Sequence, residues 1–380
     1  MTAIRFAATV RSRPRLGTAR VRPFEESDIP QVADVHRAAF RRDDASDLAE
    51  YRDYFTQVFL DTADHRISSL VFQESNGRVT GFLGLVPRLV TLDGRRYQAA
   101  VSSQFIVDPA GHVGLVALRL AKAYLEGPQD LSIADEANDV SRKIWEGLGG
   151  STALLLSMYW TRVLRPARVA LSFLRGRRRM APLAVMAAPA ATLTDSITVR
   201  LPGSQLRLSS PAVVAEPLCA GRALANSAAA GGDGILRVEY DQAAFQALLD
   251  RVAVRARDGR VLSALVKSGS AIAGWYIAYV DADGVAEVAQ LSATPSTVHA
   301  VLDRLFFDAW QAGADSVSGR LDPRFMQALS DKYCLFHRRG PWVLIHARQP
   351  ELVRALESGA TCLSRFDGEW SLRFHPSRVR

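Results

Sequence analysis

The residues best placed to do chemistry lie between positions 105 and 159. Phe105–Val107 leads into a turn, and the apolar periodicity that begins at Val113 predicts a helix directly after it. The first N–H groups of a helix have no partner within it, and the positive end of the helix dipole adds to their attraction for an anion. The turn is therefore a candidate anion-binding site. A plain strand-to-helix turn is the alternative interpretation.

Two adjacent carboxylates, Asp135 and Glu136, follow the predicted strand Asp130–Ala134. A carboxylate at the end of a strand can accept a proton from a reacting group. Glu136 is the first choice for such a base. The competing interpretation is that both carboxylates are exposed in a loop. Asn138, two residues further on, is a good N-cap for the helix predicted from there.

The elements that must position these residues form an α/β pattern with the order β-α-α-β-β-β-α-β-α-β. Periods of two predict strands, periods of three and four predict helices, and the turn signals Asn76-Gly77 and Asp93-Gly94 separate three strands of an antiparallel meander. The expected strands are Ala19–Pro23, Ser69–Gln73, Gly81–Val90, Tyr97–Val107, Asp130–Ala134 and Ser151–Tyr159, and the expected helices are Ile29–Phe40, Asp47–Asp61, Val113–Leu125 and Asn138–Leu148.

The second half of the chain repeats part of this order. Strands are predicted at Gly269–Ala278, Ala286–Ala293 and Ser316–Gly319, with a helix at Ser296–Gln311 before the last of them. Either the unit is duplicated, or the two halves share only the strand–turn–strand signals that are common to αβ units. At 380 residues two domains are expected. We predict a basic tail at 1–18, a first domain at 19–161, a basic, proline-rich linker at 162–230 and a degenerate second domain at 231–380.

The opening Val21–Ile29 and the element order that follows resemble the GCN5-related N-acetyltransferase family, in a tandem arrangement of two units. The segment from Ala137 to Gly150 is similar to the family's penultimate helix, with Asn138 at its start and Leu148-Gly149 at its end. The resemblance implies two mixed, mainly antiparallel sheets flanked by helices. It also implies an acyl-CoA site, with acetyl-CoA first, in the first unit. The residues expected to bind the co-substrate are Phe105, Ile106, Val107, Gly111, His112, Val113, Gly114 and Asn138.

This sequence departs from the family at two places. The loop that the family fills with closely spaced glycines keeps only Gly111 and Gly114. Trp145 stands where the family often has a tyrosine that protonates the departing thiolate, and an indole has no usable acid proton. Tyr159 or Ser141 could supply that proton, the thiolate could leave unassisted, or the unit could be inactive. The expected catalytic residues are Glu136, Tyr159 and Ser141.

Charge and composition limit the kinds of molecule that the protein is expected to bind. The net charge of +8 permits several anionic partners, and seven arginines crowd between Arg162 and Arg179 without one acidic residue. Such a stretch attracts anionic lipid, whereas nucleic acid is disfavoured because no aromatics are interleaved with it. The three cysteines and seven histidines are scattered, so no metal is expected. We expect a cytoplasmic protein with peripheral contact at the inner membrane face.

The sequence thus predicts an acyl-CoA-dependent N-acyltransferase that acts on an amine acceptor, with a cell-envelope or polysaccharide precursor as one candidate. An aminoacyl transferase similar to the Fem-type ligases of cell-wall synthesis is the second interpretation. A catalytically inactive tandem module that binds CoA or a partner is the third.

Overall fold

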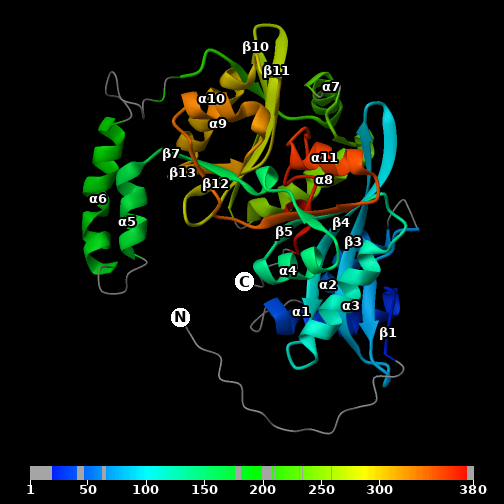
Figure 1. Ribbon diagram of the computed structural model, residues 1–380. Helices are drawn as coiled ribbons and strands as arrows, with labels where there is room; N and C mark the ends of the chain where they lie inside the picture. Colours follow the sequence, from blue (N-terminus) through cyan, green and yellow to red (C-terminus); the bar gives the residue numbers. More distant parts are fainter. Residues whose placement is uncertain are drawn as a thin grey trace.

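The structure is a computed structural model that describes residues 19–40, 47–61, 66–175, 181–198, 208, 210–230, 232, 234–257 and 259–374. It contains two mixed sheets, each mainly antiparallel and flanked by helices, which confirms the predicted fold class (Figure 1). The predicted tail at 1–18 lies outside the described residues.

The first sheet has seven strands in line, with an eighth, β9 (Arg237–Glu239), beside β3. In spatial order they are β1 (Arg20–Pro23), β2 (Leu70–Gln73), β3 (Val79–Leu92), β4 (Arg95–Val107), β5 (Leu131–Ala137), β15 (Trp342–Ala347) and β6 (Ser151–Thr152). The turn between β3 and β4 has positive φ at both Asp93 and Gly94, 51° and 75°, which is the hairpin geometry that the Asp-Gly pair predicts.

The second sheet has the same plan. Its strands run β8 (Val214–Glu216), β10 (Arg260–Ser268), β11 (Ala271–Val280), β12 (Val285–Ala293), β13 (Ser316–Arg320), β7 (Tyr159–Val163) and β14 (Leu335–His337). In both sheets the fourth and fifth strands are parallel and the other neighbours antiparallel.

The sixth strand of each sheet comes from the other half of the chain. β15, from the second half, pairs with β5 in the first sheet, while β7, from the first half, pairs with β13 in the second. The strand expected over Ser151–Tyr159 is therefore wrong as a single element. It is divided into β6, a 3₁₀ turn at Leu155–Ser157 and the first residue of β7. Apolar alternation shows that a segment is half-buried but not which sheet it joins.

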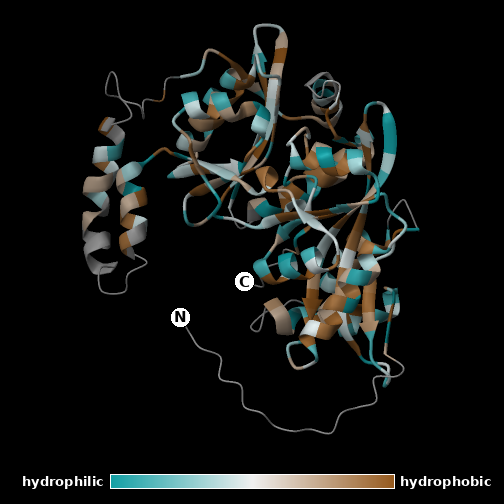
Figure 2. Ribbon diagram, in the orientation of Figure 1, coloured by the Kyte–Doolittle hydropathy of each residue, from teal (hydrophilic) through white to brown (hydrophobic). Residues whose placement is uncertain are grey.

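Helices cover both sheets. α1 (Ile29–Phe40) and α2 (Leu48–Phe55) belong to an apolar cluster with β3, and α3 (Val113–Leu125) packs on β2 and β3 in a separate cluster. In the second half, α9 (Val298–Gln311) packs on β10–β12, while α7 (Ala220–Ala230) packs on β11 and β12 and α8 (Gln242–Val254) follows it. Residues of both halves share one of these clusters, so the core continues across the junction. Figure 2 shows apolar residues along β3, β4 and α3.

Gly81 and Gly274 occupy equivalent positions in the two sheets, each at a point where a helix packs closely on a strand. A Cβ at Gly81 on β3 would lie 2.6 Å from Val116 Cγ1 of α3, and a Cβ at Gly274 on β11 would lie 2.8 Å from Val301 Cγ2 of α9. Each glycine allows the helix to approach its strand closely.

The segment expected to link the domains is largely helical. It contains β8, α7, α5 (Pro166–Arg175) and α6 (Ala181–Thr198), and the last two form an antiparallel pair set apart from the sheets (Figure 1). The remaining helices are α4 (Asp139–Gly147), α10 (Met326–Asp331), α11 (Pro350–Glu357) and α12 (Glu369–Leu372). Among the described residues, no helix combines the length and the apolar character needed to cross a bilayer.

Candidate active site

A cavity of about 430 Å³ opens where β4 and β5 separate. The parallel pairing ends at Val101 and Ile133, and beyond that point β5 remains bonded only to β15. The residues that line it come from β4, β5, α1, α3, α4 and the C-terminal segment. Of the site residues predicted from the sequence, this cavity brings together Phe105, Glu136, Asn138 and Ser141.

β4 carries a bulge at the mouth of this opening. Phe82 pairs with Ile106 and Gly84 with Ser103, so two residues of β4 oppose one of β3. Gln104 in this bulge has φ of 53°, and its side-chain oxygen lies 3.1 Å from Nε2 of the buried His36. The bulge turns the backbone toward the cavity. The Oγ of Ser103 is buried there without a hydrogen-bond partner.

Glu136 is held by two arginines. Its Oε1 accepts from Arg365 Nε at 2.9 Å and its Oε2 from Arg373 at 2.6 Å, and its side chain is 5% exposed. Burial alone would raise its pKa, but Arg365, Arg373 and Arg320 outweigh burial and lower it. A carboxylate so stabilised is a weak base, which weakens the argument for Glu136 as the proton acceptor.

Glu369 is a carboxyl group that the sequence analysis did not select. It begins α12 and lines the same cavity, and its Oε1 accepts a hydrogen bond from the Gln104 N–H at 3.1 Å. Burial, helped by the nearby charges of Asp135 and Glu136, raises the pKa of Glu369 to about 8 against the opposing effect of the Gln104 N–H. A group that titrates near neutral pH is well matched to general base catalysis.

Asp135 connects these groups to the second sheet. Its side chain is 1% exposed, and it accepts from the Glu369 N–H at 2.8 Å and from Arg320 Nη2 at 3.1 Å. Burial raises the pKa of Asp135 although Arg320 opposes this. The prediction of two exposed carboxylates does not hold, because both Asp135 and Glu136 are part of a buried ion-pair layer between the sheets.

The N-cap predicted for α4 is confirmed. The Asn138 side chain accepts from the Ser141 N–H at 2.9 Å, and both residues line the cavity. Trp145 is 2% exposed and packs edge-on against Tyr124 with ring centroids 5.6 Å apart. Trp145 forms an apolar wall of the cavity and provides no proton donor for a departing thiolate.

The turn before α3 is open but lies beyond the residues that line the cavity. Gly111, His112, Val113 and Gly114 are exposed, and a Cβ at Gly114 would have no neighbour within 4 Å. The backbone can therefore be approached from solvent. Two donors are already used, because the Ala110 N–H bonds to Asp108 Oδ1 at 2.9 Å and the Gly111 N–H bonds to the Asp108 carbonyl at 3.0 Å, and Asp108 also pairs with Arg78. Ile106 is buried and Val107 half-buried on β4.

Tyr159 is not brought to the cavity. As the first residue of β7 it lies in the second sheet, 5% exposed, and its ring stacks 6.3 Å from that of His337. Its hydroxyl is buried and has no hydrogen-bond partner. Ser141 is thus the hydroxyl of the predicted pair that reaches the site.

Nothing in the local sequence pattern points to the C-terminal segment that completes this site. Phe374 stacks on Tyr51 with ring centroids 4.5 Å apart, and the carbonyl of Leu372 accepts from Tyr54 at 2.7 Å. These contacts hold Glu369 and Arg373 at the cavity, more than 200 residues from Glu136 along the chain. Among the described residues, no group of three or more His, Cys, Asp or Glu side chains could hold a metal ion.

Comparison with known proteins agrees with this fold. No protein-family model matches the sequence, and no curated protein does. Solved structures with the fold of GCN5-related N-acetyltransferases do match, and they cover most of the chain.

Two of these solved structures have a TM-score of 0.55 and 11% identity over 87% of this chain. One is a conserved protein of unknown function from Enterococcus faecalis, described as a probable N-acyltransferase, and the match covers 72% of it. The other is a GCN5-related N-acetyltransferase from Anabaena variabilis, of which 73% is covered. Eis1 from Mycobacterium abscessus matches with a TM-score of 0.50 and 13% identity, over 86% of this chain and 73% of its own. At these identities the likeness establishes the fold.

Proposed function

We propose that this protein is an acyl-CoA-dependent N-acyltransferase, with acetyl-CoA as donor and an amine as acceptor, and that its two sheets are tandem copies of the same unit. The observation that carries the proposal is the opening between the parallel strands β4 and β5, at which a carboxyl group with a pKa near neutrality lies against a bulged strand.

The residues of this opening fit an acyl-CoA. The unpaired edge of β4 beyond Val101 and the buried, unpartnered hydroxyl of Ser103 suit the amides of a pantetheine arm. The open turn at Gly111–Gly114 and the start of α3 suit a diphosphate. The thioester, when bound, would supply an activated acyl group.

Glu369 is our proposal for the group that receives the proton from the acceptor amine. A protonated amine has no lone pair with which to attack, so a base within the water-poor cavity is needed. Glu369 is buried and neutral at low pH, and it becomes a competent acceptor only as the pH rises through about 8. Glu136 would instead stay ionised and paired with its arginines.

Turnover tests this assignment. With acetyl-CoA and a panel of amines, we expect free thiol to be released, with kcat rising as the pH approaches 8. Glu369→Gln should lower kcat by about 10²- to 10⁴-fold, the usual loss on removal of a general base, with a smaller change in KM for acetyl-CoA. Glu126→Gln, on the surface after α3, is the matched control. Equal rates for wild type and Glu369→Gln would overturn the role of Glu369.

The acceptor is proposed only by class. The basic segment favours a cell-envelope or polysaccharide precursor presented at an anionic membrane face. Binding of acetyl-CoA without thiol release for any amine would favour a binding module, and transfer from charged tRNA without acetyl-CoA binding would favour an aminoacyl transferase.

A further inference from the structure

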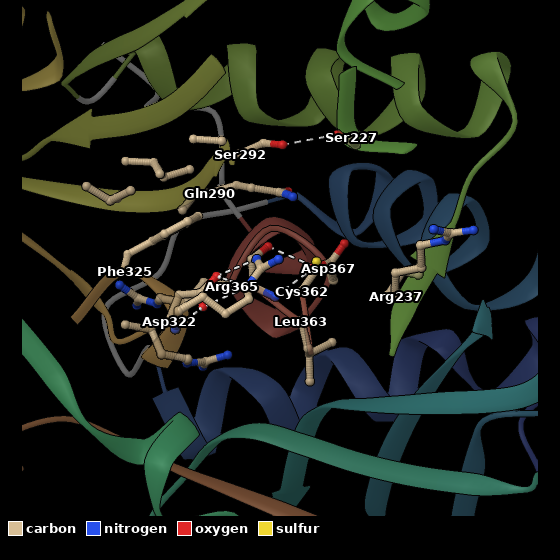
Figure 3. A pocket seen from close by; sticks show the side chains of 18 of the residues that line it. Ser227, Arg237, Gln290, Ser292, Asp322, Phe325, Cys362, Leu363, Arg365 and Asp367 are labelled. Atoms are coloured by element: carbon tan, nitrogen blue, oxygen red, sulfur yellow. Dashed lines mark hydrogen bonds and ion pairs between the residues drawn. The ribbon is translucent and has the colours of Figure 1, made fainter. Parts of the chain in front are cut away.

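A second cavity, of about 320 Å³, lies at the corresponding position of the second sheet. The parallel pairing of β12 and β13 ends at Val288 and Gly319, as that of β4 and β5 ends in the first sheet. β12 also carries a bulge, because Ile277 pairs with Gln290 and Ala278 with Val288, which leaves Ala289 extra. Figure 3 shows the side chains that converge on this opening.

This second opening is not built for a nucleotide. The turn from Thr294 to Thr297 that precedes α9 uses its own donors: the Thr294 N–H bonds to Thr297 Oγ1 at 3.1 Å, and the Thr297 N–H bonds to the Thr294 carbonyl at 3.1 Å. Pro295 has no N–H to offer. The ligand of this cavity should therefore be smaller than an acyl-CoA.

The carboxylates that line the cavity already have hydrogen-bond donors. Asp322 is bound by Arg324, with Nη2 to Oδ2 at 2.6 Å. Asp367 accepts from the Ser364 N–H at 2.8 Å and from the Tyr240 hydroxyl at 2.8 Å. Glu239 accepts from Thr91 and pairs with Arg96 at 3.0 Å. No acidic group here requires a cation.

One guanidinium group of the lining, in contrast, has donors to spare. The Arg320 side chain is 5% exposed and gives its Nη2 to Asp135, but its Nε and Nη1 are buried without a partner. Arg237 is half-exposed and lies on the far side of the cavity from Gln290 and Phe325, so water can reach its donors (Figure 3). Buried donors without acceptors are costly, so a ligand that supplies acceptors would be bound favourably.

The rest of the lining combines apolar side chains with the polar Ser227, Gln290 and Ser292. Trp160, Leu224, Phe245, Leu302 and Phe325 contribute to it, and the volume lies in the range of small-molecule pockets. We propose that the second cavity binds a small organic carboxylate with an apolar tail, its carboxylate accepting from the unpartnered donors of Arg320. This site is separate from the proposed acyl-CoA site and does not depend on it.

The probe for this site is 4-phenylbutyrate, with neutral 4-phenylbutanol as its isostere, measured by saturation-transfer NMR on the full chain. The carboxylate should bind at least about tenfold more tightly, as expected for charge-assisted hydrogen bonds. Arg320→Gln should weaken its binding several-fold, and the exposed Arg260→Gln should not. Equal affinity for acid and alcohol would overturn the proposal.

Chemical labelling of Cys362 shows where the probe binds. It uses the wild-type protein, so no substitution can disturb folding. It lines this cavity, whereas Cys219 is exposed on the surface. Bound 4-phenylbutyrate should slow the labelling of Cys362 by methyl methanethiosulfonate and leave that of Cys219 unchanged, as quantified by mass spectrometry. Unchanged labelling of Cys362 at saturating probe would place the binding elsewhere and contradict the proposal. Inorganic phosphate that protects Cys362 as well as the carboxylate does would also contradict it.

Discussion

At the scale of single residues, the site depends on carboxyl groups whose surroundings differ. Glu136 and Glu369 line one cavity, yet the arginines around Glu136 lower its pKa while burial raises that of Glu369 to about 8. Two carboxyl groups with pKa values moved in opposite directions can take different roles: Glu136 stays ionised against its arginines, and we propose that Glu369 accepts the proton.

The raised pKa of Glu369 also predicts a pH dependence of stability. Between its ordinary value of 4.5 and about 8, the folded state binds a proton that the unfolded state releases. The stabilisation is therefore complete below that interval and is lost as the pH rises through about 8. Glu369→Gln should have a flatter dependence of Tm on pH across the interval than wild type. Parallel curves for the two proteins in thermal unfolding would contradict the burial described here.

Local signals identified four residues of the cavity in advance. The helix-cap pattern identified Asn138, whose cap is confirmed, the end of a strand pointed to Glu136, and Ser141 was selected as an available hydroxyl. Glu369, His36 and Gln104 were missed because only tertiary contacts bring them there. The Glu369–Gln104 bond spans 265 positions of sequence. No short-range pattern carries that information.

At the scale of elements, the helix pair α5–α6 changes the interpretation of the basic segment. Arg165 donates to the Trp310 carbonyl at 2.7 Å, Arg168 pairs with Asp315 at 3.1 Å, and Arg162 is 5% exposed on β7. These three are engaged by the second sheet. Arg177, Arg178 and Arg179 lie outside the described residues, and on α6 Leu193 and Ile197 are 65% and 53% exposed.

Because the other three arginines of the segment are engaged, we assign the proposed membrane contact to Arg175 and Arg177–Arg179. The full chain should pellet with anionic vesicles in a salt-sensitive manner. Neutralising Arg175 and Arg177–Arg179 should weaken binding by up to about 4 kcal/mol, at roughly 1 kcal/mol per basic residue. The control neutralises four exposed arginines elsewhere, Arg260, Arg339, Arg348 and Arg354. Equal pelleting of the two quadruple variants would contradict this assignment.

Elements with strong periodicity were predictable, and the strands exchanged between halves were not. The predicted helix Val113–Leu125 coincides with α3, and the predicted hairpin turns are confirmed. The run after Gly150 was predicted as one strand from its apolar residues, but two of these, Ala153 and Leu156, are buried in the turn between β6 and β7. Burial alone does not distinguish these outcomes.

At the scale of the whole molecule, the exchange of β7 and β15 joins the two units. Neither sheet is complete without a strand from the other half, and the ion pairs of Asp135 with Arg320 and of Glu136 with Arg365 are buried between them. Breaking a buried pair on one side is costly. The two units should therefore not unfold independently.

A single cooperative transition in urea is the expected result for the full chain, with one midpoint by far-UV circular dichroism and by tryptophan fluorescence. Hydrogen exchange should give the same opening free energy for the Ile133 amide of β5 and the Val317 amide of β13, both on the paired inner strands. Two separated transitions, or amides that exchange at different urea concentrations, would show that the halves are independent domains.

The central claim is that the opening beside β4 and the turn at the start of α3 bind an acyl-CoA, and calorimetric titration with acetyl-CoA tests it most directly. Wild type should bind one equivalent. Gly114→Glu should abolish binding because it places a negative charge at the diphosphate position. The same charge stabilises the N-terminus of α3, so the variant should still fold. Gly147→Glu, at an equally open glycine on α4, should bind as wild type does. No heat of binding for wild type, or unchanged binding by Gly114→Glu, would contradict the account.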